Sequence, residues 1–358
     1  MKNIDEIKSK KTIQELLEFG IINIDKPSGP TSFNVSDFVR KILKIRKTSH
    51  FGTLDPKVTG VLPIALNRAC KLTGFFIGHD KTYVGIMRIH DDISLEEIQN
   101  KINEKFLGKI TQLPPVRSRV KRAEREREVK KFELLEKEEK EILFLTEVEG
   151  GTYIRKLISD LGDEIKKLPK ICASQSQQVK EPCANFFATQ TGNFYLFNLA
   201  TQQSTENSSK LKIKIGAHML ELRRIRAGIF SEDDKKYPSV KLYELENAIQ
   251  EFENGNEEPL RKIIIPGEII SEIYQVVEVK KEEIKKLFNG KPLFKKDVDK
   301  KFSDLEIGKK ICIFSNDILI GIYRISKEKE IFARPEFVLQ PLKEPSGSFR
   351  KSPQSSER

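Results

Sequence analysis

A single acidic residue stands in a loop rich in glycine and proline, directly before an apolar run. The loop is residues 50–60, His-Phe-Gly-Thr-Leu-Asp-Pro-Lys-Val-Thr-Gly, and the run is residues 61–66, Val-Leu-Pro-Ile-Ala-Leu. The run predicts a buried strand, and the loop glycines permit backbone angles that other residues resist. Pro56 fixes the backbone just after Asp55. An acid held this rigidly suits a nucleophile or a general acid/base, although a turn-capping aspartate shows the same pattern.

Three further segments of the sequence are as informative about the fold as this loop. Residues 20–32, Gly-Ile-Ile-Asn-Ile-Asp-Lys-Pro-Ser-Gly-Pro-Thr-Ser, predict a strand, a turn and the start of a helix. Residues 81–89, Lys-Thr-Tyr-Val-Gly-Ile-Met-Arg-Ile, predict an alternating strand with an aromatic residue near its start. Residues 150–162 begin with Gly-Gly and predict a helix whose apolar face is Tyr153, Ile154, Leu157, Ile158 and Leu161.

In this order the four segments resemble the TruB-type pseudouridine synthases, and most closely their archaeal dyskerin-type members, which are catalytic subunits of box H/ACA ribonucleoproteins. The resemblance runs from about residue 12 to residue 342. It implies an α+β fold, with a mixed, mainly antiparallel sheet in the catalytic domain and a small β-barrel-like PUA domain. It also implies an isomerase that converts uridine to pseudouridine in RNA and needs neither a metal nor an organic cofactor.

Three residues match catalytic positions of the family. Asp55 matches the nucleophile that attacks the target uridine, so that the base detaches, rotates and rejoins through carbon; attack at C6 and attack at C1′ both stay open. Arg155 matches the arginine that pairs with this aspartate, and a guanidinium keeps a carboxylate ionised in a partly buried pocket. Tyr83 matches the tyrosine that stacks on the target base and helps to move the proton from its C5.

Three further residues match substrate-binding positions. Lys26 corresponds to a lysine that supports the active-site loop, Leu157 to an apolar residue that closes the pocket, and His50 to a histidine near the flipped nucleotide. The alternatives are a solvated turn lysine, a core leucine and a structural loop histidine. The family usually has glycine before the histidine, whereas this chain has Ser49, which puts the loop geometry at His50 in question.

The charge of the chain favours an RNA partner. It carries 64 lysines and arginines against 53 aspartates and glutamates, a formal net charge of +11. Two basic clusters match basic runs of the dyskerin-type proteins, although interleaved glutamates make a solvated charged surface the alternative for the first. The RNA-binding candidates in these clusters are Arg117, Lys121 and Arg122 in the first, and Arg223 and Arg224 in the second.

The resemblance and the composition together predict the domain organisation. We expect an N-terminal extension over residues 1–19, the catalytic domain over 20–265, a PUA domain over 266–342 and a disordered tail over 343–358. In the PUA domain, a short helix followed by Asn-Gly-Lys-Pro predicts a turn that meets an RNA backbone. Its candidate RNA-binding residues are Asn289, Gly290 and Lys291.

Residues 166–213 interrupt the resemblance. Of these 48 residues, 19 are Ser, Thr, Asn or Gln and 8 are charged, whereas 33% of the whole chain is charged. One interpretation is an insertion that forms a surface excursion. The other is translated intervening sequence, which the abrupt change of composition and the intact flanks favour. We expect no catalytic role for this segment in either case.

The remaining features exclude several classes of protein. No apolar run approaches the roughly 20 residues that span a bilayer, and the first residues are too polar for a signal peptide. The four cysteines show no metal-ligand or disulfide spacing, so we expect no metal and a reducing cytoplasmic location. By resemblance, the expected partners are an H/ACA guide RNA, substrate rRNA and tRNA, a zinc-ribbon protein, a small β-barrel protein and a kink-turn-binding ribosomal protein.

Two rival functions remain open at this point. One is a standalone synthase that acts on a uridine in the tRNA T-loop, as bacterial relatives do. The other is a non-catalytic RNA-binding scaffold for ribosome assembly. The presence of Asp55, Tyr83 and Arg155 together argues against the scaffold.

Overall fold

The fold was analysed in a computed structural model, which describes residues 2–114, 121–166, 216–298, 302 and 305–341. Arg117, nearly all of the interrupting segment and the predicted tail lie outside the described residues. The chain divides into two compact units, residues 12–265 and residues 1–11 with 266–358, and each is treated by itself below.

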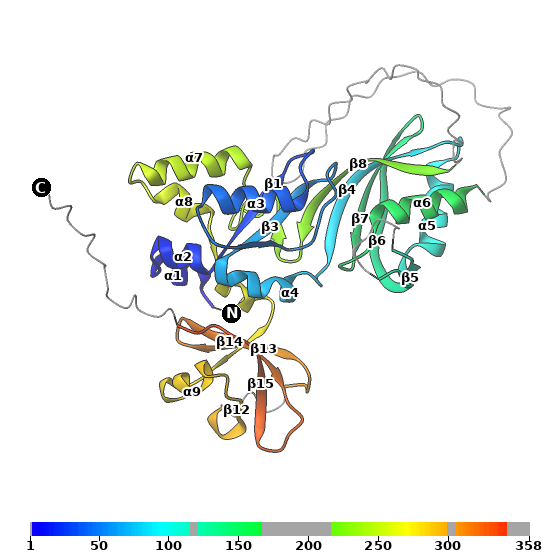
Figure 1. The fold of residues 1–358 in the computed structure, drawn as a ribbon. Helices are drawn as coiled ribbons and strands as arrows, with labels where there is room; N and C mark the ends of the chain where they lie inside the picture. The colour runs from blue at the N-terminus through cyan, green and yellow to red at the C-terminus, as the bar shows by residue number, and fades with distance from the viewer. Residues whose placement is uncertain (1, 115–120, 167–215, 299–301, 303–304, 342–358) are drawn as a thin grey trace, which may run out of the picture. The chain divides into compact units, whose positions relative to one another are not determined.

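A ten-stranded mixed sheet forms the centre of the catalytic unit (Figure 1). Its main path runs in the order β10-β1-β3-β8-β4-β7-β6-β5, with β2 paired to β3 and β9 paired to β8. The contact between β3 and β8 is short and parallel. The pairings of β1 and β2 with β3, of β7 and β8 with β4, of β5 and β7 with β6, and of β9 with β8 are antiparallel. The strands are β1 (Gly20–Lys26), β2 (Thr48–His50), β3 (Thr59–Leu66), β4 (Lys81–Ile89), β5 (Gly108–Gln112), β6 (Arg125–Glu138), β7 (Glu141–Val148), β8 (Ala217–Ala227), β9 (Phe230–Ser231) and β10 (Ile265–Pro266).

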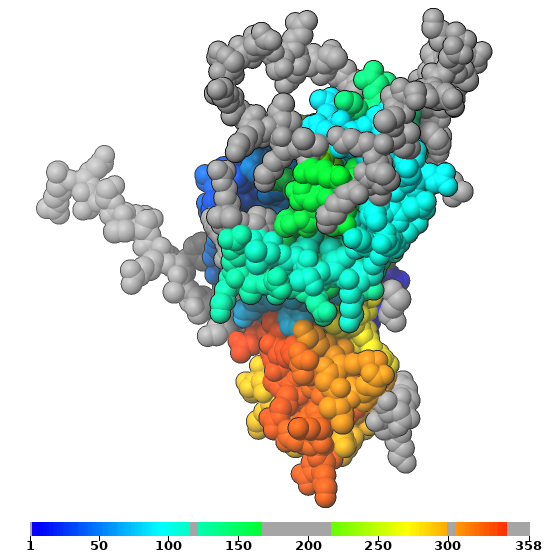
Figure 2. Space-filling view, turned by 90° about the vertical axis from the view of Figure 1, so that its right-hand side faces the viewer, coloured from blue at the N-terminus to red at the C-terminus, as the bar shows by residue number. Residues whose placement is uncertain are grey.

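Helices cover this sheet in small groups. The helix α3 packs on β2 and β3, α7 packs on α8, and α5 packs against both α6 and β6. Figure 2 looks onto the far edge of the sheet, where β5 and β6 appear in teal and α6 in green. The helices are α2 (Ile13–Glu18), α3 (Ser32–Ile42), α4 (Thr73–Phe76), α5 (Leu95–Lys105), α6 (Ile154–Ile165), α7 (Leu242–Glu253) and α8 (Glu258–Ile263), with the 3₁₀ helix η1 (Asn67–Leu72).

Local sequence signals explain where these helices begin. Ser94 and Thr12 each open a capping box, in which the hydroxyl accepts from the third helical N–H and a glutamate returns the bond. Thr31 caps α3, because its hydroxyl accepts a hydrogen bond from the N–H of Asn34. The predicted strand over residues 81–89 is β4 with the same bounds, and the predicted run over residues 61–66 lies within β3. The predicted mixed, mainly antiparallel α+β fold is therefore confirmed.

The two halves of the sheet meet at a contact that requires glycine. The strands β3 and β8 pair only at Thr59 with Arg223 and at Gly60 with Arg224. A Cβ at Gly60 would lie 2.2 Å from the carbonyl oxygen of Arg224, and Gly60 has a φ of +101°. Any larger residue would separate the strands, because both its side chain and its backbone angle are disfavoured there.

The second unit contains a five-stranded sheet in the order β11-β13-β14-β15-β12 that curls into a half-barrel, a PUA-like arrangement. A hairpin around residues 315–317 joins β13 to β14. Its core includes Tyr323, whose hydroxyl donates to the carbonyl oxygen of Leu287 at 3.3 Å. Its elements are α1 (Ile4–Ser9), η2 (Gly267–Glu272), β11 (Gln275–Glu278), η3 (Lys281–Glu283), α9 (Ile284–Phe288), β12 (Leu293–Phe294), η4 (Lys295–Asp297), β13 (Lys310–Ser315), β14 (Ile318–Ile325) and β15 (Ile331–Val338).

The first residues of the chain divide between the units. Residues 1–11 group with the PUA-like unit, whereas α2 belongs to the catalytic unit. Within the PUA-like unit, Lys10 forms an ion pair with Asp317 at 2.5 Å and Lys11 with Glu268 at 2.6 Å. Among the described residues, we find no helix with the length and apolar character that a membrane crossing requires.

The residues on either side of the interruption lie against each other. Lys166 is the C-cap of α6, and a Cβ at Gly216 would lie 3.0 Å from the Cε atom of Lys166. Gly162 is also in α6, and a Cβ there would lie 2.1 Å from the backbone nitrogen of Ala217, the first residue of β8. Since the chain leaves and returns at one place, a short connection is sufficient to join α6 to β8.

We therefore expect a variant in which a four-residue Gly-Ser linker replaces residues 167–215 to fold like the full chain. Its thermal unfolding midpoint should lie within about 4 °C of the full chain, the shift that roughly 1 kcal/mol produces. Thermal unfolding followed by circular dichroism checks this. An unfolded or aggregated variant would contradict the prediction.

Candidate active site

Asp55 lies on the loop between β2 and β3, with its side chain 54% exposed. Leu54 and Val58, on either side of it, are each 4% exposed and belong to the main hydrophobic core. The N–H of Val58 donates to the carbonyl oxygen of Asp55 at 3.0 Å and closes a turn. Because the two apolar neighbours are anchored in the core, the carboxylate between them is directed outward at a fixed place.

The buried ammonium group of a lysine supports this loop. Lys26, the last residue of β1, is fully buried, and its Nζ donates to the carbonyl oxygens of Pro27 at 2.8 Å, Pro56 at 3.0 Å and Val58 at 2.8 Å. Burial lowers the pKa of Lys26, and the nearby carboxylate of Asp55 partly offsets that effect. Lys26 is therefore a structural support of the loop and not a solvated turn lysine.

A serine in α3 adds a second support. The hydroxyl of Ser32 donates to the carbonyl oxygen of Leu54 at 2.9 Å and accepts from the N–H of Leu54 at 2.8 Å. Both partners are buried, so these two bonds are shielded from water. The contact of Ser32 with Leu54 spans 22 residues, so no local sequence pattern predicts it.

Arg155 reaches Asp55 from the start of α6. Its Nη2 forms an ion pair with Oδ2 of Asp55, although the two residues are 100 positions apart in sequence. The helix turns Ile154, Leu157 and Ile158 into the core, which leaves Arg155 on the exposed side. The N–H of Tyr153, the N-cap, donates to Oε1 of Gln112 at 3.0 Å, so β5 helps to fix the helix start.

Tyr83 and His50 complete the surroundings of the loop. Tyr83 lies on β4, is 7% exposed and pairs in register with Arg224 on β8. His50 Nε2 lies 3.0 Å from the hydroxyl oxygen of Thr53. Burial and the nearby Arg224 lower the pKa of His50, which favours the neutral imidazole. Ser49 pairs regularly with Ala65 on β3, so the serine does not disturb the strand before His50.

Leu157 lies on the inner side of α6. It is 1% exposed and belongs to the main core cluster on the inner side of α6. The structure gives it the position of a core leucine, the alternative noted from sequence. Its packing orients α6 and thereby Arg155.

The basic candidates divide into three groups. Lys121 and Arg122 are exposed at the edge of the described residues, and their neighbour Arg117 lies outside them. Arg223 binds Asp25 through two bonds of 3.0 Å and also pairs with Glu232 at 2.7 Å. Arg224 is 1% exposed, so its guanidinium lies inside the protein and not on the surface expected of an RNA contact.

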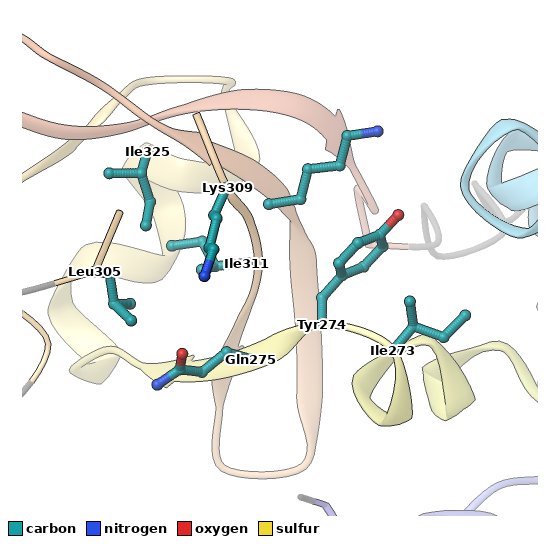
Figure 3. A pocket seen from close by; sticks show the side chains of 8 residues that line it. Ile273, Tyr274, Gln275, Leu305, Lys309, Ile311 and Ile325 are labelled. Atoms are coloured by element: carbon teal, nitrogen blue, oxygen red, sulfur yellow. The ribbon is translucent and has the colours of Figure 1, made fainter. Parts of the chain in front are cut away.

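The candidates of the PUA-like unit lie on a single exposed turn. Asn289, Gly290 and Lys291 are all exposed after α9, and Gly290 has a φ of +74° that the turn requires. In the same unit, a separate cavity of about 250 Å³ is lined by Tyr274, Gln275, Lys309 and several isoleucines (Figure 3). None of the catalytic candidates lines it.

A buried lysine beside the site was missed in the sequence. Lys81 opens β4, is 6% exposed, and its Nζ donates to the carbonyl oxygens of Ile77 at 2.7 Å and His79 at 2.8 Å. Burial lowers the pKa of Lys81 to about 8, with a further contribution from Arg224. The alternation of β4 contained a signal, because Lys81 and Tyr83 are two residues apart and point to the same face. Within the described residues, no group of three or more His, Cys, Asp or Glu is placed to hold a metal ion.

The comparisons with known proteins agree with this site. Residues 40–154 match the model of the TruB family pseudouridylate synthase N-terminal domain, and residues 211–271 match that of the tRNA pseudouridylate synthase B C-terminal domain. The chain is 33% identical to a protein of Methanocaldococcus jannaschii over 85% of this chain and 75% of the relative. This chain belongs to the TruB family of pseudouridine synthases. It is therefore an RNA isomerase that converts uridine to pseudouridine.

Further relatives extend the similarity to nearly the whole chain. A Pyrococcus furiosus TruB-family protein is 34% identical over 87% of this chain and 77% of its own length. Both relatives carry the name "Probable tRNA pseudouridine synthase B". A chain in the crystal structure of a Cbf5–Nop10–Gar1 complex is 31% identical, with a TM-score of 0.72 over 93% of this chain and 89% of that chain. A chain in the structure of an H/ACA ribonucleoprotein bound to a substrate RNA containing 2′-deoxyuridine is 29% identical, with a TM-score of 0.70 over 93% and 89%.

The depressed pKa of Lys81 predicts a pH dependence of stability. Between about pH 8 and the unfolded value of 10.5, the unfolded chain keeps a proton at this position that the folded protein has lost. Stability relative to Lys81→Met should therefore rise with pH across this window, by about 3 kcal/mol in total. Urea unfolding of both proteins at pH 7, 8, 9 and 10 measures the difference. A difference that stays constant or falls with pH would show that the lysine keeps its usual pKa.

Proposed function

We propose that this pseudouridine synthase is the catalytic subunit of a box H/ACA guide ribonucleoprotein, and that Asp55 is its nucleophile. The observation that carries the chemistry is the ion pair between Asp55 and Arg155, on a loop held by the buried Lys26. The substrate is a uridine in rRNA, selected by pairing with a guide RNA, and the protein acts in the cytoplasm. The N–C glycosidic bond of that uridine is exchanged for a C–C bond.

Each catalytic residue has its own part in the proposed reaction. The carboxylate of Asp55 attacks the target nucleotide, the bond between C1′ and N1 breaks, and the base rotates within the pocket. A bond between C1′ and C5 then forms, the C5 proton leaves, N1 gains a proton, and the carboxylate is released. Arg155 aims the carboxylate of Asp55 through their ion pair. Tyr83 contacts the flipped base and assists the transfer of the C5 proton.

The remaining candidates support these steps. Lys26 keeps the loop in one conformation through its three carbonyl acceptors. His50, held near Thr53 as a neutral ring, contacts the flipped nucleotide without adding a charge. Leu157 acts through packing, because it lies in the core behind Arg155. Taking a uridine out of its stack costs a few kcal/mol, and least where the base is already unpaired.

The structural neighbours support the guided reaction. One neighbour is titled as an H/ACA ribonucleoprotein with substrate RNA, and another as a complex with Nop10 and Gar1. A guide RNA would supply sequence selection by base pairing, so the protein needs only to contact backbone and shape. Lys121, Arg122 and the turn at Asn289–Lys291 are exposed and suited to contacts with phosphates. Arg117 remains a candidate for the same role.

A second candidate is modification of tRNA without a guide. It is favoured by the curated relatives, whose names specify tRNA pseudouridine synthase B. The two functions share the chemistry at Asp55 and differ in how the RNA is selected.

Replacing Asp55 by Asn should abolish isomerisation and leave RNA binding nearly unchanged. The amide cannot act as the nucleophile, so we expect turnover to fall by at least roughly 10⁴-fold, as the loss of a covalent catalyst does. Tritium release from RNA labelled at uridine C5 measures turnover, and filter binding measures affinity. Asp92→Asn is the matched control, because Asp92 is 95% exposed and lies outside the site. Turnover retained by Asp55→Asn would refute the assignment of the nucleophile.

The two routes of RNA selection can be separated in the same assay. We expect tritium release from an rRNA fragment only when a matched H/ACA guide RNA and the partner proteins are present. A guide with two mismatches to the target serves as the control. Release from free tRNA without any guide would instead establish the second candidate as an activity of this chain.

A further inference from the structure

The residues directly before β4 form a turn, residues 77–80, that is held by a buried lysine. Lys81 is 6% exposed, and its Nζ donates to the carbonyl oxygens of Ile77 at 2.7 Å and of His79 at 2.8 Å. A lysine is buried only at considerable cost unless its donors are satisfied, and here both acceptors belong to the backbone of this one turn. The ammonium group therefore fixes the direction in which the two carbonyl groups point.

The start of α6 lies against the same carbonyl groups. A Cβ at Gly150 would lie 2.7 Å from the carbonyl oxygen of Ile77 and 2.9 Å from each of those of Gly78 and His79. The φ of Gly150 lies outside the left-handed region, so this contact, and not the backbone angle, is what a larger residue would disturb. Gly150 precedes Arg155 by five positions. The place of the turn consequently determines where the helix that carries Arg155 begins.

The loop that carries Asp55 packs on the same part of the chain. Phe51 stacks on Phe76, the residue before the turn, with ring centroids 4.5 Å apart and 7° between the ring planes. A Cβ at Gly52 would lie 3.2 Å from Cε of Lys81. Phe51 and Gly52 are four and three positions before Asp55, so the start of the nucleophile loop is in contact with both the turn segment and its lysine.

Tyr83 is connected to the turn through the backbone. It follows Lys81 by two positions on β4, so the two side chains lie on the same face of the strand, and both are buried. Three catalytic candidates from distant parts of the sequence are thus each a few residues from one turn. A methionine at position 81 would have a similar length, but it could not donate to the two carbonyl groups.

We propose that Lys81 is a positioning residue for pseudouridine formation, which fixes the 77–80 turn and thereby the place of the Asp55 loop relative to Arg155 at the start of α6. It acts through the backbone of the turn and contacts neither the RNA nor the reacting atoms. This inference rests on the proposed roles of Asp55 and Arg155, and it holds for either route of RNA selection.

A double-mutant cycle tests the role of the turn. The four proteins are the wild type, Lys81→Met, Gly150→Ala and the double variant, each assayed by tritium release at a temperature at which it is fully folded, with the RNA that supports wild-type turnover. Each single substitution should lower kcat roughly 10- to 100-fold, the cost of displacing a catalytic group by about 1 Å. KM should stay within about threefold of the wild type, because the RNA surface is unchanged. In the Lys81→Met background, Gly150→Ala should lower kcat by no more than about threefold, since both act on the same carbonyl groups.

A matched lysine on the same turn supplies the control. Lys130 pairs with the carboxylate of Asp80 at 2.5 Å and is partly exposed, and Lys130→Met should leave kcat within about twofold. Wild-type kcat in Lys81→Met, a change in KM alone, or independent effects of the two cycle substitutions would overturn the inference. Loss of turnover in Asp55→Asn in the same assay would show that such a failure concerns Lys81 and not the proposed nucleophile.

Urea unfolding of the four cycle proteins adds a readout without RNA. If Lys81 and Gly150 act on one turn, their effects on the unfolding equilibrium constant should depart from additivity by at least about twofold, and additive effects would contradict the inference. If Lys81→Met does not fold, Gly150→Ala alone must show the fall in kcat at unchanged KM, and wild-type kcat there would overturn the inference. Absence of turnover in the wild type would refute the proposed function, and the unfolding cycle would then decide alone whether Lys81 acts on this turn.

Discussion

The site depends on the place where β3 and β8 touch over only two residue pairs. Gly60 makes this contact possible, since a Cβ there would overlap the carbonyl oxygen of Arg224. On one side of the contact are β1 and the loop with Asp55, and on the other are β4 with Tyr83 and the strands beyond it. The relative positions of Asp55 and Tyr83 depend on this junction, so the glycine is as much a part of the site as the charged residues.

Periodicity and turn chemistry were enough to predict the individual elements. The bounds of β4 agree because its residues alternate between the two faces of the sheet over nine positions. The pairing of Asp55 with Arg155 came from the family resemblance. Asp55 and Arg155 are 100 residues apart in the sequence, and no local pattern can predict a contact over that separation.

Two side chains show where reading residue types alone fails. Arg224 belonged to a basic cluster, which favours solvent or RNA, yet it lies two residues after the inward-facing Leu222 on the same strand. Strand alternation therefore places Arg224 inside the protein. The prediction gave more weight to its charge than to its position on the strand. Leu157 follows the same rule in a helix, because its spacing from Ile154 and Leu161 assigns it to the buried face. In both cases the geometry of the element decides the role more reliably than the chemistry of the residue.

The buried cations around the loop explain how a site made only of side chains is kept in one conformation. Lys26, Lys81 and Arg224 each direct their donors at backbone carbonyls, and together they contact both ends of the Asp55 loop and the segment before β4. Carbonyls satisfy such donors without neutralising them, so the surroundings of Asp55 stay positively charged. That charge attracts a negatively charged RNA backbone. The fold can therefore use the same cations to order the catalytic loop and to make the approach of RNA favourable.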